Sequence, residues 1–171
     1  SGKSEAAAGN ICLVYWKERN LPATVIRFWW AFGHDIGGRH LREMLKTAAA
    51  GEPLEFPGDS GGSFLYLEDL GQGVEKCLFA PAAYGQTFNL ATVYVTWSEV
   101  ASIVREVTGS TSQIRSTPSS EWKGSPFLAD PWELDDTSAR KLVGYGPTDP
   151  KEAKALLKKA IAARWESMKN S

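Results

Sequence analysis

Apolar residues recur along the chain with two different periods, and their alternation predicts helices interleaved with short strands. Residues 2–19 form the first predicted helix, in which Ile11, Val14 and Tyr15 follow the three-and-four spacing of one helix face. The β-branched and aromatic run over 23–30 predicts a buried strand. Further helices are expected over 40–50, 68–79, 97–108, 137–143 and from 150 onward, with strands over 54–56, 64–67, 87–91 and near 114.

Three of these helices begin at residues that are suited to cap them. Thr96-Trp97-Ser98-Glu99 forms a capping box, in which the Thr hydroxyl and the Glu carboxylate each accept from an unpaired backbone amide. Asp136 precedes the helix over 137–143, and Asp149-Pro150 places a cap before Pro at the first helical position. Residues 57–62 are expected to form a turn, and 110–134 to be mostly irregular.

The order of elements is α-β-α-β-β-α-β-α-(β)-α-α, which predicts an α/β protein built around a sheet. The 171 residues are enough for a single domain, and they contain neither an internal repeat nor an interdomain linker. Only 23–30 and 87–91 have the pattern of buried parallel strands. A strand at 24–30 left at a sheet edge would expose unpaired backbone groups. We therefore expect something else to cover that edge.

Composition narrows the classes of function. Acids and bases are mixed along the chain, the net charge is −1, and no basic stripe suggests a nucleic-acid partner. No apolar run approaches the roughly 20 residues that a membrane span requires, so no membrane partner is expected. Cys12 and Cys77 are too few for a disulfide framework and lie in no metal-binding pattern. A cytoplasmic location is the expectation.

Two motifs suggest catalysis and have simpler interpretations. Residues 58–62, GDSGG, are the string that surrounds the nucleophile of chymotrypsin-like proteases. A Ser nucleophile needs a His base, but His34 and His40 lie in or beside a glycine-rich loop, so a turn is favoured. His34-Asp35 with His40 could form a metal or acid–base site, but no third ligand stands at a suitable spacing. No metal site is predicted.

The adjacent Trp29 and Trp30 leave two interpretations open. Either ring could stack on a base or a sugar. Alternatively, because neighbouring strand residues face opposite sides, one could lie in the core while the other covers the opposite face.

Six segments of the chain carry motifs that occur together in one family. They are SGKSEAAA at 1–8, LPATVIRFWWAFG at 21–33, GEPLEFPGD at 51–59, FLYLEDL at 64–70, FNL at 88–90 followed by VT at 95–96, and DTSARKLVGY at 136–145. In this order they resemble the second half of the extended short-chain dehydrogenases/reductases, the NAD-dependent epimerase/dehydratase family. The resemblance implies a partial Rossmann-like fold: the C-terminal substrate-binding portion without the N-terminal dinucleotide-binding half.

The chain departs from this family at the positions that carry its chemistry. Where the family's first helix has its catalytic Tyr and Lys, this chain has Ser1 and Glu5. A phenol whose pKa is lowered by an ammonium group can exchange a proton with the substrate, and neither replacement can do so. The glycine-rich phosphate-binding turn of the cofactor half is also missing from the sequence. We therefore assign no catalytic or cofactor-binding residue, and expect no NAD(P) binding by this chain alone although the family implies it.

The resemblance also implies a substrate side and an assembly. The substrate-binding residues it indicates are Trp30, Phe56, Gly58 and Tyr66, with a nucleotide-sugar-like small molecule as the ligand. Trp30 replaces the Asn that usually contacts substrate, and Gly62 stands where many members carry an Arg. The expected function is that of a substrate-binding half that is inactive in isolation; the alternative is a non-catalytic ligand-binding or assembly module. A homo-oligomer built from the first helix and the 24–30 edge is expected.

Overall fold

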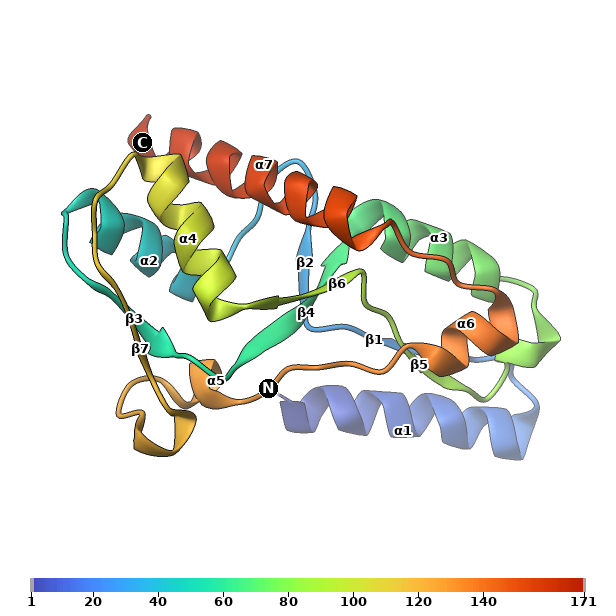
Figure 1. Ribbon diagram of the computed structural model, residues 1–171. Helices are drawn as coiled ribbons and strands as arrows, with labels where there is room; N and C mark the ends of the chain where they lie inside the picture. Colours follow the sequence, from blue (N-terminus) through green and yellow to red (C-terminus); the bar gives the residue numbers. More distant parts are fainter. Residues whose placement is uncertain (1, 171) are drawn as a thin grey trace.

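The computed structural model describes residues 2–170, with side chains from Ala6 onward, and Figure 1 shows its path. Its helices are α1 (Gly2–Arg19), α2 (Arg39–Ala49), α3 (Leu67–Cys77), α4 (Trp97–Thr108), α5 (Pro126–Ala129), α6 (Thr137–Val143) and α7 (Pro150–Lys169). Its strands are β1 (Val25–Arg27), β2 (Trp30–Phe32), β3 (Leu54–Pro57), β4 (Gly61–Tyr66), β5 (Thr87–Asn89), β6 (Val93–Thr96) and β7 (Ile114–Thr117). Short 3-10 turns lie at Pro81–Ala83 and Ser119–Glu121.

The strands form three small sheets. β1 pairs with β5 and β3 pairs with β7, both in parallel. In the third sheet, β4 lies between β2, to which it is parallel, and β6, to which it is antiparallel. The mixture of helices with mainly parallel strands confirms the predicted α/β class.

The predicted strand over 23–30 is two strands. β1 ends at Arg27 and β2 begins at Trp30, and the two belong to different sheets. The backbone carbonyl of Arg27 still accepts from Leu90 N at 2.9 Å, but Phe28 and Trp29 lie outside both ladders. A continuous β-branched and aromatic run could not reveal this break, because the pattern specifies extended backbone but not the neighbouring strand.

The glycine-rich segment after Pro57 is also more ordered than expected. Gly61 and Gly62 belong to β4 and pair with Thr96 and Val95, although the sequence predicted a turn through residue 62. Both positions need glycine because a Cβ on Gly61 would lie 2.3 Å from the Val95 carbonyl oxygen, and one on Gly62 would lie 1.9 Å from the Trp29 ring. Close packing, rather than chain reversal, explains these two glycines.

Two of the three predicted helix caps are present. Thr96 Oγ1 accepts from Glu99 N at 3.2 Å, while Glu99 Oε2 accepts from Thr96 N at 2.8 Å, so the capping box is confirmed. Asp149 accepts from the backbone N–H groups of the first turn of α7. The cap at Asp136 is wrong: its carboxylate pairs with Arg140, and the neighbouring Asp135 accepts from Thr137 N at 2.9 Å.

The buried apolar side chains form two clusters. The larger one joins α2, α4 and α7 to the sheets β2–β4–β6 and β3–β7, and its members include Leu45, Phe56 and Leu157. The smaller one lies between the β1–β5 sheet, α3 and α6, around Leu65, Phe88 and Tyr145. In Figure 1, α7 crosses one side of the molecule beside α4, while α1 runs along the opposite side next to β1 and β5. Within residues 2–170, no helix is both long and apolar enough to cross a membrane.

Candidate functional site

The structure places two of the four predicted substrate residues on neighbouring strands. Trp30 begins β2 and Tyr66 ends β4, and the ladder pairs Trp30 with Phe64 and Phe32 with Tyr66. Phe56 and Gly58 lie on and just after β3, in a different sheet. The four residues therefore form two separate pairs, and Trp30 with Tyr66 makes the better candidate site.

Trp30 is held firmly in place. Its indole Nε1 donates to the Gly37 carbonyl at 2.9 Å, and its ring stacks on Phe64 with centroids 5.5 Å apart and an interplanar angle of 25°. Gly38 has φ of 119°, and a Cβ there would lie 2.3 Å from the Trp30 ring. Because the loop backbone lies directly against the indole, the ring has a fixed orientation in this structure.

Tyr66 is positioned by a buried polar network. Its backbone N–H donates to Thr92 Oγ1 at 2.9 Å, and the Thr92 hydroxyl in turn donates to Asp69 Oδ2 at 2.6 Å. Asp69 is 5% exposed and also accepts from the backbone N–H and the hydroxyl of Thr148, at 3.1 and 2.9 Å. A buried carboxylate is stable only when its oxygens are hydrogen-bonded. The network therefore fixes both the end of β4 and the approach to α7.

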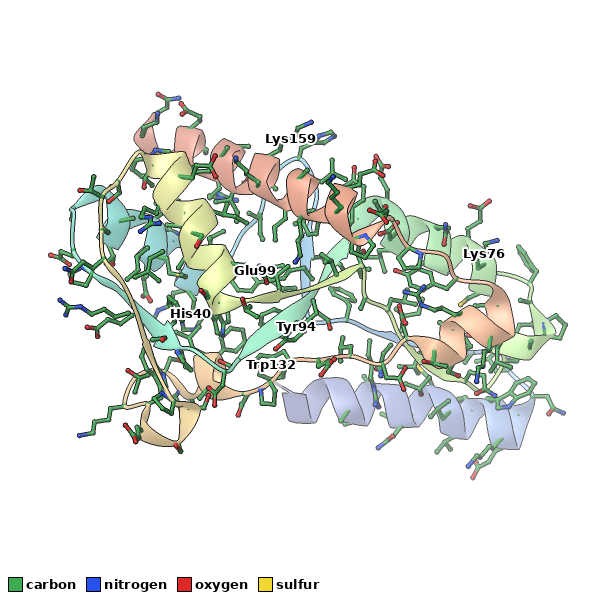
Figure 2. The ribbon with its side chains drawn as sticks, in the orientation of Figure 1. His40, Lys76, Tyr94, Glu99, Trp132 and Lys159 are labelled. Atoms are coloured by element: carbon green, nitrogen blue, oxygen red, sulfur yellow. The ribbon has the colours of Figure 1, made fainter. Side chains whose placement is uncertain are left out.

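Trp30 belongs to a dense aromatic cluster that the sequence did not reveal as a unit. Trp29 stacks on Phe127 and Trp132, with centroids 5.6 and 6.0 Å apart, and meets Trp30 edge-on at 5.4 Å. Figure 2 shows Trp132 below the β4–β6 sheet, on the connection that follows α5. The only sequence signal was the unusual count of seven Trp. We use the name aromatic cluster for Trp29, Trp30, His40, Phe64, Trp97, Phe127 and Trp132, and ring contacts continue from Phe64 to Phe32 and from Phe32 to Tyr66.

The two tryptophans do not face opposite sides, as alternation along one strand would require. Both are half-buried, and both contact Phe64, Trp97 and Phe127. The reason is the break between β1 and β2, which removes Trp29 from the regular pleat. Trp29 Nε1 is buried and has no hydrogen-bond partner among the described residues, whereas the indoles of Trp97 and Trp132 donate to carbonyls at 2.9 and 2.8 Å.

Phe56 and Gly58 are accounted for by packing. The Phe56 side chain is 1% exposed and lies in the larger apolar cluster. Gly58 lies where the end of β3 approaches β7 closely, because a Cβ there would be 2.7 Å from Ser116 Cβ. Its N–H continues the ladder to the Thr117 carbonyl at 3.0 Å. Only the exposed backbone of Gly58 could therefore meet a ligand without rearrangement of the core.

The tyrosines near the candidate site do not have the properties of a proton-transferring phenol. Partial burial, followed by the neighbouring Glu68 carboxylate, raises the pKa of Tyr66. Burial also raises the pKa of Tyr94, with Glu133 and Glu99 adding to the effect. Tyr94 belongs to β6 and is labelled in Figure 2. Both phenols remain protonated at neutral pH, whereas a phenol that exchanges protons at that pH needs a lowered pKa.

In the GDSGG segment, residues 58–59 form a turn, and Gly61 and Gly62 begin β4. Ser60 is 2% exposed, and its hydroxyl donates to the Leu128 carbonyl at 2.6 Å. Asp59 accepts from Ser119 N at 3.0 Å, and its hydrogen bond from the Ser119 side chain is the main reason that its pKa is lowered. A buried hydroxyl that donates its hydrogen bond to a carbonyl, and not to a base, cannot serve as an activated nucleophile.

The two histidines do not converge on a metal site. His34 is exposed, and His40 stacks on Phe127 with centroids 4.9 Å apart and the rings nearly parallel at 6°. The Nδ1 atom of His40 lies 3.9 Å from a Glu43 carboxylate oxygen. Among the residues that the structure describes, no group of three or more His, Cys, Asp and Glu side chains could hold a metal ion.

The glycine-rich turn between β2 and α2 is the closest approach in this chain to a phosphate-binding turn. It connects a strand to a helix N-terminus, as dinucleotide-binding turns do. However, the Trp30 ring occupies the space against Gly38, and a Cβ on Gly33 would lie 2.8 Å from the Leu67 side chain. These residues do not fit a dinucleotide pyrophosphate, which needs open backbone amides at that position.

Solved structures of epimerases share this fold. An epimerase from Methanothermobacter thermautotrophicus aligns with a TM-score of 0.70 and 19% identity, covering 95% of this chain and 50% of its own. UDP-glucose 4-epimerase from Thermotoga maritima, solved with UDP-glucose, gives a TM-score of 0.65 at 17% identity, with coverage of 96% and 52%. UDP-glucuronic acid 4-epimerase from Bacillus cereus, solved with NAD, gives 0.65 at 18%, with coverage of 94% and 49%. No protein-family model and no curated protein matches the sequence.

The coverage values are as informative as the scores. Nearly the whole chain superposes, yet it spans only about half the length of these enzymes. This agrees with the order of the six sequence motifs, all of which resemble the second half of the family. The chain therefore shares the α/β fold of these epimerases over about half of their length.

Proposed function

We propose that this chain is the substrate-binding half of an epimerase/dehydratase-like protein and forms a single domain over residues 1–171. The observation that carries the proposal is the superposition of 95% of the chain on half of an epimerase. The proposed ligand is a nucleotide-sugar-like small molecule, because the similar structures include enzymes solved with UDP-glucose and with UDP-glucuronic acid. The proposed location is the cytoplasm, in keeping with two free cysteines, one of them exposed.

The proposed contact surface is formed by the start of β2 and the end of the neighbouring strand β4. Trp30 offers an aromatic face that can stack on a sugar or a base, and Tyr66 offers a protonated hydroxyl that can donate a hydrogen bond. Of the other two predicted residues, Gly58 is proposed to contact the ligand through its exposed backbone, whereas the Phe56 ring is buried and makes no contact with it.

The isolated chain is proposed to be catalytically inactive and to bind no NAD(P). Ser1 lies outside the described residues, and for Glu5 the structure describes only the helical backbone. Neither residue type can replace a phenol and an ammonium group. Restoring Tyr at Ser1 and Lys at Glu5 in this chain should therefore give no nicotinamide-dependent turnover, because the cofactor would still be absent.

A homo-oligomer is part of the proposal. The outward face of α1 exposes Ile11, Val14 and Tyr15, and β1 has β5 as its ladder neighbour on one side only among the described strands. Burying each such side chain contributes about 1.5–3 kcal/mol. Covering the α1 face and the β1 edge with further protein, either a second copy or a cofactor-binding half, stabilises both.

A direct binding experiment tests the substrate proposal. Isothermal titration of the purified chain with UDP-glucose should show saturable binding, whereas titration with NAD or NADP should show none. Trp30→Phe keeps an aromatic face but loses the hydrogen bond to Gly37, and Tyr66→Phe removes the hydroxyl; both should weaken binding. Lys76→Ala, an exposed change at the far end of α3 (Figure 2), is the control. Micromolar NAD affinity, or UDP-glucose binding that ignores Trp30 and Tyr66, would contradict the proposal.

The second candidate is a non-catalytic ligand-binding or assembly module that retained the fold. The aromatic cluster favours it, because Trp29, Phe127 and Trp132 pack tightly together around Trp30 and strengthen the fold at the candidate site itself. Absence of nucleotide-sugar binding together with stable self-association in light scattering would favour this module over the substrate-binding half.

A further inference from the structure

A positively charged hollow lies between α2 and the C-terminal part of α7. Its volume is about 380 Å³, and it is lined by Arg42, Lys46, Arg164, Ser167 and Met168. Three of these five side chains are cationic, and none is a carboxylate. The whole chain has a net charge of −1, so this local excess of positive charge does not follow from its composition.

Arg164 is fixed in the hollow by the loop that precedes α2. Its Nε donates to the Ile36 carbonyl at 2.8 Å, and its Nη2 lies 2.6 Å from Asp35 Oδ2. These contacts engage part of a guanidinium group that has five N–H donors. The side chain is 29% exposed. Arg164 is therefore a pre-positioned group that can direct further donors into the hollow.

The two cations on α2 form no ion pair with a described carboxylate, although Lys46 lies close enough to Glu43 to interact with its charge. Arg42 and Lys46 stand one helical turn apart on the same face, where like charges repel each other. Within residues 2–170, neither forms an ion pair with a carboxylate. Glu43, the acid of this helix, accepts from Arg39 Nε at 2.8 Å instead. Lys46 lies in the last turn of α2, where a positive charge complements the helix dipole. Arg42 lies near the start of the helix, so the dipole does not explain its charge.

We propose that this hollow binds a phosphate group, either as free phosphate or as a phosphate monoester. A tetrahedral dianion can accept from a guanidinium through two oxygens at once and still contact a second arginine and a lysine. Such a ligand offsets the repulsion between Arg42 and Lys46. The residues of this hollow differ from those of the Trp30–Tyr66 surface. The phosphate proposal can therefore be tested independently of the proposed substrate.

Isothermal titration at constant ionic strength tests the proposal, with inorganic phosphate and glucose 1-phosphate as probes and chloride as the balancing anion. The Arg42→Glu/Lys46→Glu variant reverses two cations of the hollow. The matched control, Lys151→Glu/Lys159→Glu, reverses two exposed lysines on α7 outside it and gives the same net charge. Figure 2 shows Lys159 on the outer surface of α7.

The expected result is saturable phosphate binding by the wild-type chain that weakens about tenfold or more in the first variant and changes by less than about twofold in the control. Circular dichroism verifies that both variants are folded. Tighter binding of glucose 1-phosphate than of phosphate would assign the hollow to a monoester, and equal binding would assign it to free phosphate. Absence of saturable binding, or equal weakening in both variants, would overturn the proposal.

Discussion

The part of the molecule around α2, α4 and α7 is closed, whereas the part around α1, the β1–β5 sheet and α3 is open. In the first, the apolar faces of the helices are buried against two sheets and against one another. Among the described residues, every large apolar side chain that is strongly exposed lies on α1, α3 or α6 or in the segments that flank β1 and α3, and Figure 1 shows these elements at one end and side of the fold. The exposed side chains are Ile11, Val14, Tyr15, Leu21, Phe28, Leu67, Val74, Leu78, Phe79 and Leu142.

The most unusual of these exposed residues is Phe79. It is 90% exposed and has φ of 57°, a backbone conformation that is rare for a bulky side chain. It borders a shallow hollow formed with Pro22, Ile26 and Leu78 next to β1. An apolar surface spread over several elements beside a free strand edge is typical of a protein–protein interface. The contrast between the two parts supports the proposal that further protein covers the open part.

The largest effect is expected from truncation in the closed part. Leu157 on α7 is 0% exposed, so Leu157→Ala removes buried methyl groups and leaves a cavity. We expect a loss of about 2–5 kcal/mol in the free energy of unfolding, measured by urea denaturation. The same truncation at Val14, on the open face of α1, should cost less than about 0.5 kcal/mol in a dilute monomer. Equal losses at the two positions would remove the distinction between the parts.

Asp69 connects α3 to the approach of α7, and its removal should give the next largest effect. Asp69→Ala leaves the buried Thr92 hydroxyl and the Thr148 N–H without their acceptor. An unsatisfied buried donor costs about 1–3 kcal/mol. Urea denaturation should show a loss in that range, and Asp69→Asn, which keeps one acceptor oxygen, should recover part of it. A wild-type midpoint in the Ala variant would show that the network contributes nothing.

The sequence predicted the positions of the helices and strands better than it predicted which strands pair with each other. Helix positions followed from spacing and caps, because those are local properties that a few adjacent residues determine. The division of 23–30 between two sheets, and the extension of β4 to Gly61, depended on contacts with Leu90, Val95 and Trp29, which lie far away in the chain. Long-range packing of this kind leaves little trace in a single sequence.

The candidate site was predictable only in part, for the same reason. Motif resemblance pointed to Trp30 and Tyr66, and the structure places them on neighbouring strands. The motif resemblance could not reveal that Phe127 and Trp132, which come from an apparently irregular segment, stack on Trp29. Nor could it reveal that Phe56 is a core residue, because a turn motif specifies backbone shape and not side-chain burial.

The open face of α1 gives a test of assembly in which two neighbouring residues should behave differently. If α1 forms the interface of a homo-oligomer, a charge on the helix face that meets the partner should disrupt assembly. In the structure, Trp16 faces inward onto Tyr84, with ring centroids 5.6 Å apart, and lies against Gly85, whereas Val14 is 48% exposed. Val14→Glu should therefore dissociate a homo-oligomer without changing the fold, and Trp16→Glu should destabilise the chain itself by about 1–3 kcal/mol.

Light scattering together with urea denaturation separates these outcomes. The mass of the Val14→Glu particle should fall to that of a monomer while its unfolding midpoint, at low concentration, stays near that of the wild type. A Lys17→Glu variant, which changes charge on the exposed side of the same helix, serves as the control. A wild-type chain that remains a folded monomer at high concentration would refute the proposal that the open face of α1 forms a homo-oligomer interface.

The smallest effect is expected in the closed part, where surface charges join α4 to α7. Lys154 Nζ lies 2.5 Å from Glu99 Oε1, and Lys158 pairs with Glu106. Partial burial pushes the pKa of Glu99 upward, but the hydrogen bonds from Lys154 and Thr96 outweigh it, so the net pKa lies below its ordinary value. The folded state therefore favours the ionised carboxylate. This contribution is fully present above the unfolded-state pKa of about 4.3 and is lost as the pH falls through the lower folded-state pKa.

Comparison of the wild type with Glu99→Gln over a range of pH isolates this contribution. The side chains of Glu99 and Lys154 are 40% and 43% exposed, so solvent screening limits the ion pair to about 0.5 kcal/mol. Glutamine can still accept from Thr96 N, which preserves the capping box. The wild type should be more stable than the variant by that amount at pH 7, and the difference should disappear near pH 3. A difference that stays constant between these two pH values would mean that the charge of Glu99 contributes nothing, and that the two helices are held together by their apolar faces alone.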